Sequence, residues 1–464
     1  GGLVRRDAAS LFGASQRWQT YGRGSFAWRV SEEPWFKVPK ISDLKFRISE
    51  GTAGNRPTYS AQYETFSMGA GGSLTPSNLG NKNLRPEVSR ELEIGVDLEV
   101  MNKYGVTITH AKNVINDQLL PVTPPAASGF GTQWQNAGEL TNKTWEFSLN
   151  VPIIQQRDLS YSVRFNYDAT TSIVSRLDMP ETFYTAAGQQ GSETMFKIKQ
   201  GEVFGSIWGN YFIKKCSQLP AAFASKCGSG QDYQVNSNGY VVYVGAGNTP
   251  ADGITKNLWF TRIPAASAPW GGGTTIDNMS WGSPILLRDA TGAPAIVNIG
   301  HALPDYHWSF SQNLNFKKFT VYALLDATVG KSVWNEQRQW SLGDFQTAEA
   351  DQFGKSVEEA KPIGYYYRTV SNGPSFGGLY NVLAPNNHTV EDASFVKLRE
   401  LSIGYRFGRL PGVGGDWSVS FIGRNLKTWT KYTGYDPEVG VGGGQLGSGA
   451  LNAIDAFNFP NLRQ

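Results

Sequence analysis

Few residues of this 464-residue chain have the types and spacing that catalysis or metal binding would need. His301, Asp305 and His307 form a group with metal-ligand chemistry, because imidazole and carboxylate both bind zinc. We expect these three instead to be solvated or interfacial, where a loop meets a strand. The chain has four His and contains neither a GxSxG nor an HExxH motif. No acid pair stands out at a strand end, so the sequence predicts no enzyme, no metal and no cofactor.

The two cysteines, Cys216 and Cys227, are eleven residues apart in a loop-like segment. This spacing fits a small disulfide-closed loop in an oxidising compartment. Two free thiols are the alternative.

The long segment 173–303 carries aromatic side chains separated by Gly, Ser, Asn and Pro. Aromatic rings stack on sugar rings or peptide side chains, while neighbouring amides hydrogen-bond to the same ligand. The alternative is that these aromatics pack the loop on itself or face a protein that covers it. The candidate contact residues are Trp208, Tyr211, Tyr240, Tyr243, Trp259, Trp270 and Trp281.

Composition argues against an ordinary soluble protein. Charged residues make up 17% of the chain, against about a quarter in typical globular chains, and aromatics reach 13%. No run approaches the ~18 apolar residues of a membrane-spanning helix, so any membrane must be crossed by strands. The net charge of +3 is close to balanced and no basic run stands out, which argues against a nucleic-acid-binding protein.

The stretch ELEIGVDLEV at 91–100 alternates apolar and mostly acidic residues without interruption, which predicts a strand with two different faces. If the apolar face meets lipid, the lipid-facing residues are Leu92, Ile94, Val96 and Leu98. Similar patterns predict ten strands, at about 20–30, 41–50, 88–100, 103–112, 140–153, 158–172, 304–316, 319–330, 391–408 and 415–428.

The predicted connections alternate between short and long along the whole chain. The long ones are 51–87, 113–139, 173–303 and 331–390, and a further long segment follows at 429–464. Outer-membrane barrels have this rhythm, with short periplasmic turns and long extracellular loops. The pattern therefore favours an antiparallel transmembrane β-barrel; a soluble sandwich or propeller is the alternative.

Five segments in order resemble SusC/RagA-type TonB-dependent outer-membrane transporters. They are RRDAASLFGASQRWQTYGRGSFAWRVSEEPWF followed by ISDLKFRISEGTAGN (5–55), NLRPEVSRELEIGVDLEVM (83–101), GEVFGSIWGNYF (201–212), EDASFVKLRELSIGYRF (391–407), and FIGRNLKTWTKYTGYDPEVG (421–440) with its Y-x-G-x-D-P-E motif. Together they span nearly the whole chain.

The resemblance implies a 22-stranded barrel with an N-terminal plug in a bacterial outer membrane. It further implies import of oligosaccharides or peptides, energised by the TonB–ExbB–ExbD complex, beneath a SusD-like surface lipoprotein. Residues 1–464 would form the C-terminal part of the barrel, and no plug or TonB box is found in this chain. A surface adhesin, a structural outer-membrane β-protein and a passive porin are the alternatives.

Overall fold

A computed structural model of the chain describes residues 1–10, 17–56, 59–186, 193–252, 281–343, 346–362, 365–366, 378–380, 384–410, 412, 414–438 and 453–456. Its main element is an eleven-stranded antiparallel sheet whose strand order follows the chain. The strands are Gly2–Ala8 (β1), Trp18–Arg29 (β2), Ile41–Asn55 (β3), Glu87–Val100 (β6), Tyr104–Val122 (β7), Gln133–Gln155 (β8), Leu159–Leu177 (β9), Tyr306–Phe316 (β16), Phe319–Val329 (β17), Phe395–Arg409 (β20) and Asp416–Thr430 (β21).

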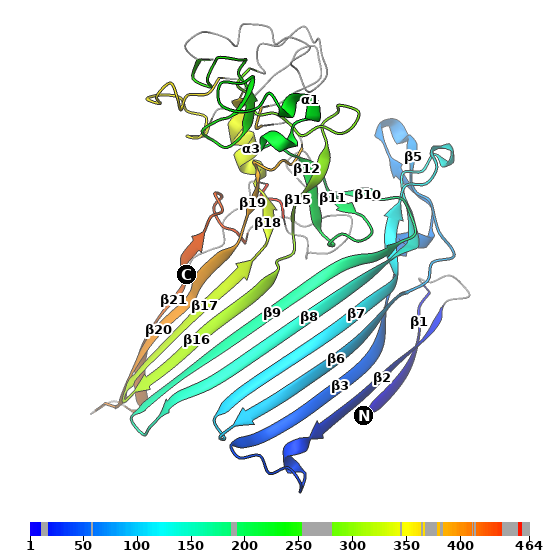
Figure 1. Cartoon of the computed structure of the whole chain (residues 1–464). Helices are drawn as coiled ribbons and strands as arrows, with labels where there is room; N and C mark the ends of the chain where they lie inside the picture. The colour runs from blue at the N-terminus through cyan, green and yellow to red at the C-terminus, as the bar shows by residue number, and fades with distance from the viewer. Residues whose placement is uncertain are drawn as a thin grey trace.

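Short and long connections lie at opposite ends of this sheet (Figure 1). The tight turns include 101–103, where Met101 and Asn102 have φ of 58° and 52°, the left-handed values of the two central residues of a type I′ turn, which the Lys103 N–H closes on the Val100 carbonyl. The long connections gather at the other end, around the helices Ala221–Ala224 (α1) and Glu336–Gly343 (α3). We call this region the loop end of the sheet, and the opposite one the turn end.

The loop end contains several smaller elements. They are Thr65–Met68 (β4) with Leu74–Asn78 (β5); Thr182–Ala186 (β10), Glu193–Ile198 (β11), Ser206–Asn210 (β12) and Ile296–His301 (β15), which form a four-stranded sheet; Tyr233–Val235 (β13) with Val241–Tyr243 (β14); and Ser332–Trp334 (β18) with Val390–Asp392 (β19). Short 3-10 turns occur at Val30–Glu32, Tyr59–Gln62, Ala70–Gly72, Ala126–Ser128 and Cys216–Gln218.

Within the main sheet, the structure differs from the predicted strands in two places. It contains one strand that the pattern did not reveal, β1, which pairs with β2 from Gly2↔Gly24 to Ala8↔Trp18. Its apolar residues Leu3 and Val4 are adjacent in sequence and therefore do not alternate.

The second difference concerns the predicted loop 113–139. Most of it is strand, because β7 runs on to Val122 and β8 begins at Gln133. Apolar side chains such as Leu120 and Ala137 are buried on these extensions, where they pack against loop-end residues. Strand pairing therefore continues beyond the main apolar band.

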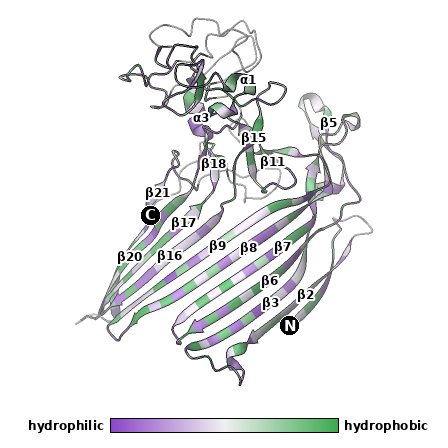
Figure 2. Cartoon of the chain, in the orientation of Figure 1, coloured by the Kyte–Doolittle hydropathy of each residue, from purple (hydrophilic) through white to green (hydrophobic). Residues whose placement is uncertain are grey.

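The two faces of the sheet differ in chemistry. Hydrophobic and hydrophilic residues alternate along each strand (Figure 2). Ile94 pairs with Ile48 on one side and with His110 on the other, so these three residues share a face. Ile48 and Ile94 are 44% and 47% exposed although both are aliphatic, as expected for a surface that meets lipid. Among the described residues, no helix has the length and apolar character needed to cross a membrane.

Candidate functional site

The polar face of the sheet is organised around Arg47. Its guanidinium lies 3.1 Å from the Glu93 carboxylate and 3.0 Å from the Asp97 carboxylate. Arg47 pairs in register with Gly95, and a Cβ at that position would lie 2.6 Å from the Arg47 Nη2 atom. The E-x-G-x-D pattern of residues 93–97, within the segment 83–101, therefore has a physical explanation: two carboxylates bind one arginine, whose guanidinium crosses over the glycine between them.

Next to this cluster, the polar face has an open hollow of about 470 Å³. Arg5, Arg23, Glu91, Glu93 and Ser49 line it. Charges of both signs with hydroxyl groups suit a water-filled interior better than a packed core.

The D-P-E tract at 436–438 lies against strand β20. Its two carboxylates form a second charged cluster with basic residues of that strand. Lys397 lies 2.7 Å from Asp436 and 2.5 Å from Glu438, although its side chain is only 2% exposed. Arg399 binds Glu438 as well and lies 2.6 Å from Asp326 of β17. Burial alone would raise the pKa of Glu438, but hydrogen bonds from Arg399 and Lys397 outweigh it and lower that pKa to about 2.

The first tyrosine of the same motif, Tyr432, has a structural role. Its hydroxyl donates to Asp455 at 2.6 Å, and the side chain is buried. Burial, and then the Asp455 carboxylate, raise the pKa of Tyr432. The motif therefore ties the segment after β21 to the sheet and to residues near 455.

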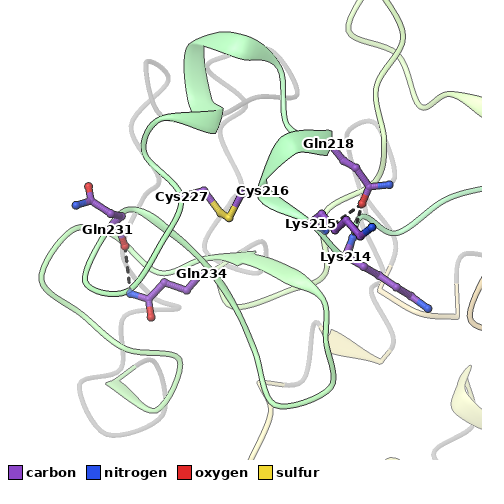
Figure 3. The surroundings of a disulfide bond; sticks show 7 residues. All are labelled: Lys214, Lys215, Cys216, Gln218, Cys227, Gln231 and Gln234. Carbon is purple, nitrogen blue, oxygen red and sulfur yellow. Dashed lines mark hydrogen bonds between the residues drawn. A yellow bond between two sulfur atoms is a disulfide. The ribbon is translucent and has the colours of Figure 1, made fainter.

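Figure 3 shows the disulfide between Cys216 and Cys227, whose Cα atoms are 5.6 Å apart. Gln218 accepts hydrogen bonds from the backbone N–H groups of Lys214 and Lys215 at 2.8 and 3.0 Å. These contacts hold one side of the closed loop in a tight turn.

Four of the candidate ligand-contact aromatics lie in the interior of the loop end. Trp208, Tyr240, Tyr243 and Trp281 are all less than 9% exposed, and Tyr243 packs edge-on against Tyr233 at 5.3 Å. Their observed role is to form the core of the loop end, because no ring face is open for stacking. Tyr211 is half-buried, and Trp259 and Trp270 lie outside the described residues.

A buried network joins three segments of the loop end. His388 Nε2 lies 2.7 Å from Glu349, and Tyr240 lies 2.8 Å from Nδ1. Nε2 also lies 3.0 Å from Arg338 Nη2, so the two ring nitrogens contact a carboxylate, a guanidinium and a tyrosine hydroxyl. Arg338 binds Glu349 at 2.8 Å and Glu391 at 3.0 Å.

Burial determines the protonation of this network. It lowers the pKa of His388, even though Glu349 favours the charged imidazole. Burial would raise the pKa of Glu349, but hydrogen bonding to His388 and the charge of Arg338 lower it to about 2. Burial also raises the pKa of Tyr240 to about 12. At neutral pH the network therefore holds a neutral histidine between ionised Arg338 and Glu349.

Beside this network is a second open hollow, of about 450 Å³, between α3 and the Y-x-G-x-D-P-E tract. Its lining includes Arg338, Gln337, Gln346, Glu349 and Tyr435. Tyr435 is 65% exposed, so its ring and hydroxyl are both accessible. Amides, a guanidinium and an open aromatic ring can bind hydroxyl-rich or amide-rich ligands.

Sequence patterns alone could not find this hollow, because its residues come from segments about one hundred positions apart. The partial signal was Tyr435, which lies inside a motif that the sequence already singled out. Neither Arg338 nor Glu349 lies in a recognised pattern.

The histidines considered as metal ligands make other contacts. His301 Nδ1 lies 2.6 Å from the Leu303 carbonyl, and His307 Nδ1 lies 2.9 Å from the Thr328 hydroxyl. Within the described ranges, no three His, Cys, Asp or Glu side chains are grouped as a metal site would require.

The fold agrees with what is found among known proteins. A family model described as "TonB dependent receptor-like, beta-barrel" matches residues 3–265, more than half of the chain. The chain belongs to this family. Its members are outer-membrane transporters rather than enzymes.

Relatives match along nearly the whole chain. TonB-dependent receptor P3 of Formosa agariphila is 26% identical over 99% of the chain and 42% of its own length. TonB-dependent receptor SusC of Bacteroides thetaiotaomicron is 25% identical over 95% of the chain and 40% of its own length. The SusC/RagA-type resemblance is confirmed, and the chain spans less than half the length of these relatives.

A solved structure of the RagAB peptide importer in the "open-open" state has the same fold. It superposes with a TM-score of 0.65 at 19% identity, over 100% of this chain and 44% of the solved one. The eleven-stranded sheet is thus part of a TonB-dependent receptor barrel.

Proposed function

We propose that this chain forms part of the wall of an outer-membrane importer of oligosaccharides or peptides. The observation that carries the proposal is the pairing of two features on one sheet. One face is apolar and exposed, whereas the other carries the Arg47 cluster and a hollow of about 470 Å³. A sheet of this kind separates lipid from a polar interior through which a hydrophilic solute can pass.

The proposed orientation of the barrel in the membrane rests on the placement of the connections. The long connections lie together at one end, which in outer-membrane barrels is the extracellular one. The hollow beside Tyr435 lies at this end and has the polar and aromatic lining that glycans or peptides require. The loop end is therefore where substrate is captured.

The partners of the proposed importer follow from its family. Energy would come from the TonB–ExbB–ExbD complex, through a plug and TonB box. A SusD-like surface lipoprotein would cover the loop end, and outer-membrane lipid would surround the apolar face. Peptide import is supported by the fold shared with the RagAB peptide importer, and the choice between oligosaccharides and peptides rests on the SusC/RagA-type resemblance.

Uptake by intact cells tests this function. Labelled oligosaccharide and peptide mixtures are offered to wild-type cells, to cells lacking the gene and to cells lacking TonB. We expect one class of solute to accumulate only in wild-type cells. Uptake that persists without TonB would identify a passive pore, and uptake unaffected by loss of the gene would contradict import altogether.

A matched pair of variants tests the capture site. Tyr435→Ala removes an exposed ring from the hollow, whereas Phe353→Ala removes a 95% exposed ring that does not line it. Loss of one aromatic contact weakens binding by about 0.5–1.5 kcal/mol, or about two- to tenfold. Solute affinity should fall for Tyr435→Ala alone; equal effects of both variants would place the capture site elsewhere.

A further inference from the structure

Two lysines lie opposite each other on the lipid-facing side of the sheet. Lys112 of β7 pairs in register with Leu92 on one side and with Lys143 of β8 on the other. The next row toward the turn end consists of Ile94, His110 and Trp145. Because paired residues share a face, both lysines lie on the face of Ile94 and not on the polar face that carries Arg47. Both side chains are exposed.

Counted from the turn end, these lysines are the first charged residues on the outward faces of β7 and β8. On β7 the outward residues below Lys112 are Tyr104, Val106, Ile108 and His110. Tyr104 and Lys112 are about 26 Å apart along the strand, which is about 20 Å of membrane depth at a tilt of about 40°. His110 and Trp145 stack with their ring centroids 4.3 Å apart, as aromatic side chains do at a membrane–water interface. The two ammonium groups therefore reach the lipid headgroups at the loop end.

The charge of the pair is not compensated by the part of the protein that the structure describes. Like charges directly opposite each other weaken an antiparallel pair. The neighbouring outward-facing cation, Arg90, lies 2.5 Å from Glu50 and is thereby neutralised. Neither lysine forms an ion pair with any described carboxylate. An anion from outside the chain would relieve this repulsion.

We propose that Lys112 and Lys143 together bind the phosphate of an anionic lipid in the leaflet that surrounds the loop end. Two ammonium groups at headgroup depth complement a phosphate oxygen cluster, and the His110–Trp145 stack below them contacts the start of the acyl chains. The site depends on the sheet lying in a membrane and not on which solute the barrel imports.

Full-length purified protein in neutral-lipid nanodiscs provides the test. Phosphatidic acid and diacylglycerol with the same acyl chains serve as probes, because they differ only in the phosphate. Retained probe is counted by native mass spectrometry across a concentration series. Wild-type protein should prefer phosphatidic acid, and the variant K112Q/K143Q should bind it about 25-fold more weakly, at about fivefold per lysine.

The control variant K215Q/K226Q removes the same charge from exposed loop-end lysines near the disulfide, and it should retain wild-type affinity. Heat-modifiable migration on unboiled gels verifies that each variant is folded. Equal affinity of wild-type protein for the two probes would overturn the proposal. So would an equal loss of affinity in both variants, because general electrostatic attraction would then explain the binding.

Discussion

Val96 is the position where a charge on the lipid face should be most damaging. It lies midway along the outward apolar residues of β6, which run from Leu92 to Val100, and it pairs with Phe46 and Ile108. Both neighbours are aliphatic or aromatic yet about two-fifths exposed, at 42% and 41%. Arginine at the bilayer midplane of a barrel costs about 2–4 kcal/mol, and the cost falls to about 0–1 kcal/mol near the interfaces.

The expected ranking of arginine variants follows from depth. Val96→Arg should lose about 2–4 kcal/mol, and Ile94→Arg should lose less because it lies about 7 Å farther along the strand toward the interface. Ser49→Arg is the matched control, because Ser49 lies on the polar face, lines the hollow and pairs with Glu93. A new guanidinium there meets water and a carboxylate, so its effect should stay within about 0.5 kcal/mol.

Urea unfolding of the full-length protein in lipid vesicles, followed by the heat-modifiable band, measures these differences. A loss of about 2–4 kcal/mol would lower the urea midpoint by about 1–2 M at an m-value of about 2 kcal/mol/M. If Ser49→Arg is as damaging as Val96→Arg, the two faces are assigned the wrong way round. If Val96→Arg and Ile94→Arg are equally damaging, the proposed depth of the strand is wrong.

Three further predictions concern the clusters of the loop end. Replacing Glu438 by Gln removes one of the carboxylates that neutralise the buried Lys397, and it should destabilise the protein by about 3–5 kcal/mol in the same urea assay. The control Glu358→Gln, at an exposed loop residue, should leave the stability unchanged. His388 has a folded-state pKa below its usual 6.5, so the unfolded chain takes up more protons as the pH falls. The free energy of unfolding should therefore be constant above about pH 6.5 and decrease below it. His388→Gln should abolish that decrease in thermal melts between pH 7 and 5. Reducing the disulfide should loosen its loop by about 3 kcal/mol and speed trypsin cleavage after the exposed Lys226, whereas non-reduced protein should yield linked Cys216 and Cys227 peptides. Slow cleavage in both redox states would show that the disulfide does not brace this loop.

The strand pattern was predictable where the two faces of a strand have different surroundings. ELEIGVDLEV alternates because Ile94 and Glu93 have different surroundings, and the sequence records that difference directly. β1 escaped prediction because Leu3 and Val4 break the alternation, and β7 was cut short at residue 112 because Lys112 ends the apolar stripe although pairing continues.

The interior of the loop end was less predictable. Spacing suggested the Cys216–Cys227 pair, but nothing local distinguishes a buried tyrosine such as Tyr240 from an exposed one. Its burial depends on packing against Phe212 and on His388, nearly 150 residues away. Contacts of that range are set by tertiary packing, and the sequence pattern of a single loop carries no record of them.

The orientation of the barrel is the claim on which the whole account depends. Epitope tags inserted after Ser237, in the loop end, and after Gly414, in the β20–β21 turn, measure it directly in cells that produce the full-length protein. The account predicts that antibody labels the Ser237 tag on intact cells and the Gly414 tag only after the outer membrane is permeabilised. Labelling of the Gly414 tag on intact cells, with the Ser237 tag protected, would contradict the proposed capture of substrate at the loop end.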